Sequence, residues 1–184
     1  MDIKEKEGLG RKDSWLQTFT GRKMWPLDPR PSEIFIEDIA HALANQCRFA
    51  GHCQRFYSVA EHSVRVAEAC TKENRLWGLL HDAAEAYCCD LPAPLKRLPE
   101  MRQFRDCEKA ILMAVAEKFG LPPDVPSEVK HADMVLLATE KRDLMAVGPE
   151  WGWLPDPLPR KIIPLDQQAA EKGFMTEFRI LMLS

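Results

Sequence analysis

Proline placement is the feature that most constrains how this chain can fold. The 184 residues include 14 prolines, which fall into clusters at 26–31, 92–99, 122–126 and 149–164. Because proline inside a helix costs about 3 kcal/mol, helices are confined to the stretches between these clusters. Those proline-free stretches are residues 32–91, 100–121, 127–148 and 165–184.

Each proline-free stretch has the apolar periodicity of amphipathic helices. Apolar residues recur at helical spacing over 39–47, 59–70, 77–84, 104–119, 129–144 and 174–181. The sequence Ser58-Val59-Ala60-Glu61 has the pattern of a capping box and predicts a helix that begins near Val59. Gly120 is placed to end one helix, and Asp166 is placed to cap the last one. We therefore predict an all-α fold, a compact helical bundle.

The N-terminal part of the chain has a different character. The segment from Thr18 to Ile36 contains Gly21, several prolines and short β-favouring pieces around Phe19 and at 34–36. This pattern predicts a small N-terminal β-hairpin. We assign residues 1–17 to a flexible tail and residues 18–184 to a single domain.

Charge and composition exclude several classes of protein. The chain has 25 Lys and Arg against 28 Asp and Glu, a net charge of −3, which argues against a general binder of duplex nucleic acid. No apolar run approaches the roughly 20 residues of a membrane helix. The charged N-terminus does not resemble a signal peptide. We expect a cytoplasmic protein whose six cysteines, which include no CxxC pair, are reduced.

Polar residues interrupt the apolar stripes at a few positions. His62, the pair His81-Asp82, and Asp133 lie on helix faces that should be buried. A buried carboxylate costs several kcal/mol unless it is paired or binds a metal. Together they predict a metal site in the helical core, and such N and O ligands suit Mn, Fe, Co, Ni or Zn rather than Ca. Each residue alone also has a simpler explanation, as a hydrogen-bonded core histidine or a capping or ion-paired aspartate.

The order of these residues resembles the HD-domain metal-dependent phosphohydrolases. The matching motifs are His62 in SVAEHS, His81-Asp82 in LLHDAAEAY, and Asp133 in HADMVLLATE. Residues 47–63 and 81–96 further resemble bacterial 5′-deoxynucleotidases and phage or prophage dATP triphosphohydrolases. The resemblance covers roughly residues 18–145 and implies an HD-domain helical bundle.

The resemblance also implies roles for individual residues. His62, His81, Asp82 and Asp133 would bind a divalent transition metal, with Zn, Co or Mn first and Fe or Ni as alternatives. Glu85 would act as the general base or orient the attacking water, and Asp90 would assist at the same site. A second divalent ion near Glu85 is a further expectation.

Substrate-binding residues are implied on the same basis. Arg48 and Lys96 match the phosphate-binding cations of the family, and His52 and Arg55 are candidate contacts for a phosphate tail. Phe49 stands where the deoxynucleotidases have a tryptophan that favours deoxyribose, so the sugar selectivity stays open.

The implied reaction is metal-dependent hydrolysis of nucleoside or deoxynucleoside 5′-phosphates by a metal-activated water. It would convert a dNMP to nucleoside and phosphate, or a dNTP, with dATP as one candidate, to deoxynucleoside and triphosphate. The implied assembly is a homo-oligomer, from dimer to hexamer. The alternatives are an HD phosphodiesterase or alarmone-type hydrolase acting on another phosphoester, and a non-catalytic HD binding module.

Two further features allow more than one interpretation. Glu140 returns to the face of Asp133 two turns later, and we interpret it as one half of a salt bridge with Arg142 or another cation. Trp151 and Trp153 lie in the proline-rich segment 148–164, where they would either form the wall of a base pocket or cap the core.

Overall fold

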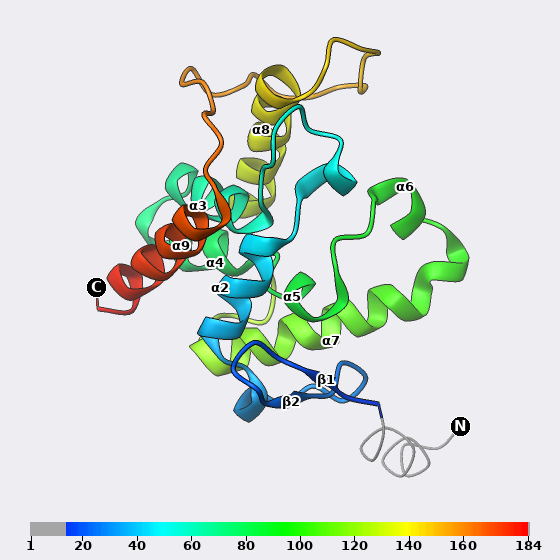
Figure 1. The fold of residues 1–184 in the computed structure, drawn as a ribbon, viewed down its shortest axis with the longest axis vertical. Helices are drawn as coiled ribbons and strands as arrows, with labels where there is room; N and C mark the ends of the chain where they lie inside the picture. The colour runs from blue at the N-terminus through cyan, green and yellow to red at the C-terminus, as the bar shows by residue number, and fades with distance from the viewer. Residues whose placement is uncertain (1–13, 184) are drawn as a thin grey trace.

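A computed structural model of the chain describes residues 14–183, and most of them are helical (Figure 1). The α-helices are α2 Ile36–Asn45, α3 Val59–Ala69, α4 Arg75–Leu80, α5 Glu85–Cys88, α6 Ala93–Lys96, α7 Arg102–Phe119, α8 Ser127–Leu144 and α9 Gln167–Met182. The 3₁₀ helices are η1 Pro31–Glu33, η2 Arg48–Gly51, η3 Lys72–Asn74 and η4 Pro99–Met101. The prediction of an all-α fold with a small N-terminal hairpin is confirmed.

The hairpin lies earlier in the chain than predicted. Strands β1 Leu16–Gln17 and β2 Lys23–Met24 pair antiparallel, with Leu16 opposite Met24. Residues 34–36 form no strand, because the chain leaves η1 and begins α2 at Ile36. Strand β1 falls within the segment that we assigned to the tail, so the folded domain begins before residue 18. Residues 1–13 of the predicted tail lie outside the described residues.

The predicted helix ends are largely confirmed. The Ser58 hydroxyl accepts a hydrogen bond from the Glu61 backbone N–H at 3.1 Å, Asp166 caps α9 with its side chain, and Gly120 ends α7 at φ 68°. The capping box at Ser58 is incomplete, however. Glu61 Oε2 instead accepts a hydrogen bond from the Leu165 backbone N–H at 2.9 Å. This bond fastens the segment before α9 to the first turn of α3.

The prediction of one continuous helix over residues 77–84 is wrong in one respect, because the helix is interrupted in the middle. Helix α4 ends at Leu80 and α5 begins at Glu85. Across the gap the Ala83 N–H donates to the Leu80 carbonyl and the Glu85 N–H donates to the Asp82 carbonyl, both at 3.0 Å. These bonds link residues three apart, which is the tighter 3₁₀ pattern. His81 and Asp82 therefore lie in a turn.

The core consists of two apolar clusters with α3 and α4 in common. One cluster joins α2, α4, α7 and α9 through fully buried side chains that include Leu43, Leu79, Ile111 and Phe174. The other joins α3, α4 and α8 through Val66, Trp77, Val129 and Leu136. The α3–α4 pair thus lies between the two clusters, and it carries both histidines of the predicted site.

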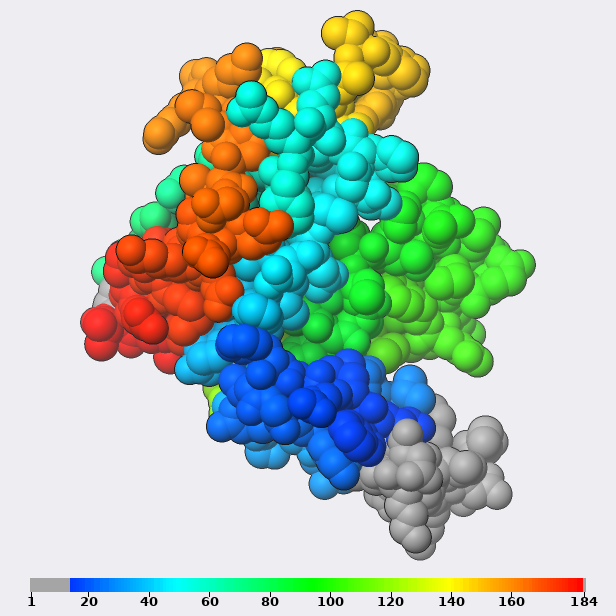
Figure 2. All heavy atoms as spheres, in the orientation of Figure 1, coloured from blue at the N-terminus to red at the C-terminus, as the bar shows by residue number. Residues whose placement is uncertain are grey.

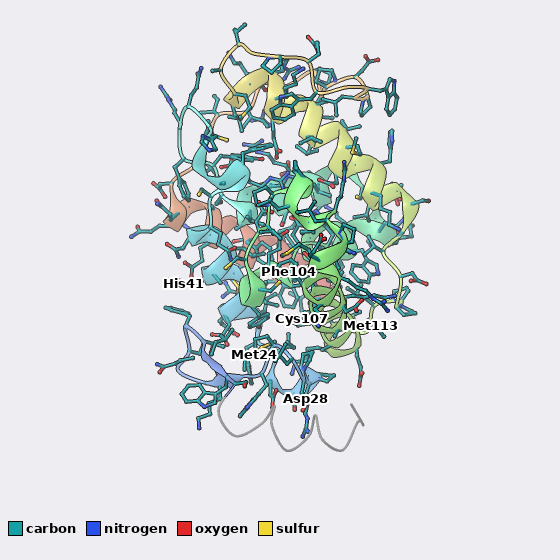
Figure 3. The ribbon with its side chains drawn as sticks, turned by 90° about the vertical axis from the view of Figure 1, so that its right-hand side faces the viewer. Met24, Asp28, His41, Phe104, Cys107 and Met113 are labelled. Atoms are coloured by element: carbon teal, nitrogen blue, oxygen red, sulfur yellow. The ribbon has the colours of Figure 1, made fainter. Side chains whose placement is uncertain are left out.

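The N-terminal segment packs beneath α7. In Figure 3, Met24 and Asp28 lie below Cys107 of α7. Met24 is fully buried, and Cys107 Sγ donates to the Pro26 carbonyl oxygen at 3.1 Å. All six cysteines are free thiols. Among residues 14–183, none of the helices combines the length and the apolar character that spanning a bilayer requires.

Gly78 allows α3 and α4 to approach closely. A Cβ atom at this position would lie 2.8 Å from Ala67 Cα and 3.1 Å from Ala67 N. Because both contacts are with backbone, no side-chain rotation could relieve them. The Gly78 carbonyl also accepts a hydrogen bond from His81, so the same residue sets the spacing of the helices and the orientation of a site histidine.

We predict that Gly78→Ala destabilises the protein by about 1–3 kcal/mol, the usual cost of overpacking a core. Denaturant unfolding of both proteins would measure the difference. Gly173→Ala is the matched control, since it lies inside α9 with no atom within 4 Å of the added Cβ. Alanine should there be neutral or stabilise by up to about 1 kcal/mol. Equal behaviour of the two variants would contradict a rigid α3–α4 contact.

Candidate metal centre

His62 is held at the centre of the molecule by a buried carboxylate. Its ring lies on α3 and is fully buried, and its Nδ1 lies 2.6 Å from Oε1 of Glu140 on α8, which is fully buried too. Burial would raise the pKa of Glu140, but the charges of Arg48 and His62 lower it, so this carboxylate is ionised and accepts the proton of Nδ1. The Nε2 atom of His62 therefore faces away from Glu140 and is free to bind another group.

His81 presents the same nitrogen from the end of α4. Its Nδ1 donates to the Gly78 carbonyl oxygen at 2.7 Å, and its Nε2 lies 3.3 Å from His62 Nε2. Since each ring uses its Nδ1 atom in a hydrogen bond, the two Nε2 atoms face each other. Such an arrangement requires a cation or a proton between them.

Asp82 completes a group of three. Its Oδ2 lies 3.2 Å from His81 Nε2 and 3.6 Å from His62 Nε2. Bonds of about 2.0–2.2 Å to one ion place neighbouring ligand atoms roughly 3–3.5 Å apart, which is close to these spacings. His62, His81 and Asp82 form a possible metal-binding triad, with ligand atoms all within 4.8 Å of one another.

Asp133 lies at the edge of this triad. Its Oδ1 on α8 is 3.2 Å from His62 Nε2, and its side chain is 39% exposed. It is not part of the mutually close group of three. Its role as a fourth ligand stays a prediction.

The pKa values of His62 and Asp82 depend strongly on the charges of neighbouring residues. Burial and the Arg48 charge lower the pKa of His62, but Glu140 and Asp133 outweigh them and raise it to about 9. Burial alone would raise the pKa of Asp82, but His81, His62 and Arg48 hold it well below its usual range. Without metal, a proton on His62 thus occupies the position of a cation beside an ionised Asp82.

Glu85 lies directly beside the triad. Together with His81, Asp82 and Glu108 it lines a cavity of about 280 Å³. Burial raises the pKa of Glu85 to about 9, with Asp82 and Asp90 adding to the effect. Within the described part of the chain its Oε2 is buried without a hydrogen-bond partner. A buried acid with an unused oxygen next to three ligand atoms is suited to hold a water or a proton.

Asp90 is close to the site without touching the triad. Its backbone N–H donates to Gln46 Oε1 at 3.2 Å, and the preceding Cys89 has φ 69° and ψ 155°, an uncommon conformation for a residue with a side chain. Burial raises the pKa of Asp90, and Asp82 adds to this while Arg48 opposes it.

Arg48 joins two of the carboxylates. Its Nη2 lies 3.1 Å from Glu140 Oε2 and its Nη1 lies 3.5 Å from Asp82 Oδ2. The interpretation of Glu140 as paired with another cation is thus confirmed, with Arg48 and His62 as its partners. The alternative partner, Arg142, is wrong, because its guanidinium binds Asp143 at 2.8 Å. The sequence contains one signal for this network, the seven-residue spacing from Asp133 to Glu140.

Some of the remaining predicted substrate-binding residues lie at the site, and others do not. Lys96 Nζ lies 2.6 Å from Glu108 Oε1 and 3.6 Å from Glu85 Oε1, at the edge of the site. Phe49 follows Arg48 directly in η2. His52 and Arg55 are exposed, and within residues 14–183 neither makes an ion pair or side-chain hydrogen bond with a triad residue, so the structure does not bring them into the site.

Comparison with known proteins shows the family of the chain. No protein-family model matches it. It is 42% identical over 173 residues to the uncharacterized protein YfdR of Escherichia coli (strain K12), covering 91% of this chain and 96% of YfdR. The chain belongs to the YfdR family. It is also 38% identical over 130 residues to the uncharacterized protein RCAP_rcc00048 of Rhodobacter capsulatus, covering 66% of each chain. Neither YfdR nor the second relative has a name that states an activity.

We predict that rising pH lowers the stability of the metal-free protein and increases the stabilisation that added metal provides. The pKa is raised to about 9 from 6.5 for His62 and from 4.5 for Glu85, so between these values the folded state holds more protons than the unfolded state. The free energy of unfolding of the metal-free protein should therefore fall as pH rises from 6.5 to 9. The stabilisation by added Mn²⁺ should grow over the same range, because the ion displaces the His62 proton.

Thermal unfolding with chelator and with Mn²⁺ across this range tests the prediction. Replacing the exposed His131 by Gln should leave both trends unchanged. A Tm of the metal-free protein that rises toward pH 9 would contradict the assigned proton on His62.

We predict that Glu140→Gln weakens both the fold and metal binding. The substitution keeps the volume but removes the closer of the two carboxylates that Arg48 contacts and leaves only Asp82, which should cost about 3 kcal/mol or more. Loss of the carboxylate behind His62 should lower metal affinity about 10- to 100-fold. Unfolding and metal competition assays measure the two effects. Glu150→Gln, which removes an exposed pair with Lys141, should change stability by less than about 1 kcal/mol.

Proposed function

We propose that this chain is an HD-type metal-dependent phosphohydrolase that cleaves nucleoside or deoxynucleoside 5′-phosphates. The observation that carries the proposal is the convergence of two histidine Nε2 atoms and an aspartate oxygen beside the buried Glu85. The order of His62, His81-Asp82 and Asp133 along the chain, which resembles the HD-domain set, supports it.

The donor set fits a divalent transition metal. His62, His81 and Asp82 would hold it, with Asp133 as the fourth ligand, and mixed imidazole and carboxylate ligands suit Zn, Co or Mn, with Fe and Ni as alternatives. When bound, such an ion lowers the pKa of a water and neutralises charge on a phosphoryl oxygen. Four protein ligands are few enough to leave room for both.

Glu85 is the residue best placed to handle the proton of the attacking water. It lines the same cavity as His81 and Asp82, and its pKa of about 9 is set by burial and by Asp82. A carboxyl group with a pKa raised this far can hold a proton at neutral pH. A second divalent ion near Glu85, as the resemblance implies, would compete with that proton.

Two cations are available for the phosphate. Lys96 shares its charge between Glu108 and Glu85, and an ammonium group has three donors, so one can still reach a phosphate oxygen. Arg48 already contacts Asp82 at 3.5 Å, which places its guanidinium beside the triad. These charges suit an anionic substrate even though the net charge is −3. We further propose a cytoplasmic homo-oligomer.

A product assay tests the proposal. The purified chain would be incubated with Mn²⁺, Co²⁺ or Zn²⁺ and a panel of dNMPs, NMPs, dNTPs and NTPs, and the products would be separated by chromatography. Nucleoside and phosphate from monophosphates alone would make it a 5′-nucleotidase, whereas intact triphosphate from a dNTP would make it a triphosphohydrolase. Absence of turnover with every metal and substrate would refute the proposal.

We predict that substitutions separate metal binding from turnover. His81→Ala should abolish both, because it removes a ligand. Glu85→Gln should retain the metal and lower kcat by about 10²- to 10⁴-fold, the usual contribution of proton transfer by a positioned side chain. Metal analysis and steady-state kinetics on the same samples provide the measurement. Glu117→Gln, an exposed change on α7, is the control. Full activity of Glu85→Gln would remove Glu85 from the mechanism.

A further inference from the structure

The segment between α8 and α9 places tryptophans at the surface beside η2. Trp151 is 36% exposed and Trp153 is 81% exposed. The Trp151 ring centroid lies 5.6 Å from that of Phe49, with the ring planes tilted by 49°. Figure 2 shows this segment, in gold, above the cyan η2 region. The rings are tilted rather than stacked on each other, and Trp151 is exposed enough for a planar group to reach it.

The aromatic pair is directly connected to the metal triad. The Arg48 guanidinium carbon lies 5.3 Å from the Phe49 ring centroid, and the same guanidinium reaches Asp82 Oδ2 at 3.5 Å. The order from the buried site outward is therefore triad, guanidinium, Phe49 and Trp151. A ligand whose phosphate lies at the triad would extend its next group toward the two rings.

Each ring has a local contact or backbone conformation that favours its position. Phe49 and Ala50 have φ values of 54° and 49°, left-handed conformations that side chains rarely adopt, and these turn Phe49 out of the helical path. On the other side, Lys141 Nζ binds Glu150 at 2.8 Å and lies 5.8 Å from the Trp151 ring centroid.

The rest of the segment is fastened to α8. The Leu158 N–H donates to the Thr139 hydroxyl at 2.9 Å, and the Ile162 N–H donates to Asp143 at 2.8 Å. Trp151 thus belongs to a segment tied to the same helix that carries Asp133 and Glu140.

We propose that Trp151, together with Phe49, forms a stacking platform for the base of the substrate. This inference rests on the proposed function. Aromatic rings bind planar bases by stacking, and neighbouring cations such as Arg48 and Lys141 strengthen the interaction. The platform would account for recognition of a nucleotide rather than of any phosphoester, since the triad and its cations would contact only the phosphate.

The test compares two ligands that differ in the base. The Mn²⁺-loaded protein would be titrated with dAMP and with ribose 5-phosphate in a calorimeter. Trp151→Ala should weaken dAMP binding about 5- to 100-fold, the equivalent of one lost stacking contact, and leave ribose 5-phosphate unchanged. Trp151→Phe should retain most of the affinity for dAMP. Trp153→Ala, which removes the neighbouring exposed ring, should change neither ligand.

Other results of these experiments would contradict the proposed stacking platform, and each points to a different explanation. Equal weakening of both ligands would mean that Trp151 supports the fold. Unchanged dAMP binding, with a lower mass of Trp151→Ala in light scattering, would place Trp151 in a subunit contact. If the wild type hydrolyses nucleotides and Trp151→Ala binds dAMP normally, only the platform fails. If the wild type neither binds nor hydrolyses any nucleotide, the proposed function fails with it.

Discussion

The fully buried carboxylate of Glu140 is the interaction on which the site depends. A buried carboxylate is tolerated only with charged or hydrogen-bonding partners, and in the described part of the chain His62 and Arg48 each bind one oxygen of Glu140. His62 binds Oε1 from α3, and Arg48 binds Oε2 from the segment before it. The requirement to satisfy one charge thereby joins three separate parts of the chain. It also fixes the tautomer of His62 that leaves Nε2 free.

The turn between α4 and α5 positions two other residues of the site, Asp82 and Glu85. In a 3₁₀ turn, residues three apart are eclipsed, so Asp82 and Glu85 lie on one side of the chain. An uninterrupted α-helix would rotate these two residues apart by part of a turn. The break after Leu80 thus aligns a ligand residue and a buried acid more closely than an α-helix would, and both line a single cavity.

Local signals in the sequence were reliable because they act over a few residues. The prolines bounded the longer helices, and the caps at Ser58 and Asp166 lie where the sequence predicted them. The short helix α6 contradicts the expectation, because it lies within the 92–99 cluster and carries Pro94 in its first turn, where proline is tolerated. The break after Leu80 carries no glycine or proline, so periodicity alone predicted a continuous helix. The apolar residues at 34–36 favour a strand intrinsically, but burial of Ile34 against the helices overrides that preference.

The same network sets the order in which the protein can assemble. The bond between His62 and Glu140 closes a separation of 78 residues, one of the longest-range contacts of the site. While the chain is being synthesised, His62 has no carboxylate behind it until α8 has emerged and docked. His81 and Asp82, which are adjacent in sequence, are available much earlier. The histidine that completes the triad is thus oriented late, and an ion captured before that moment would be held by only part of its ligands.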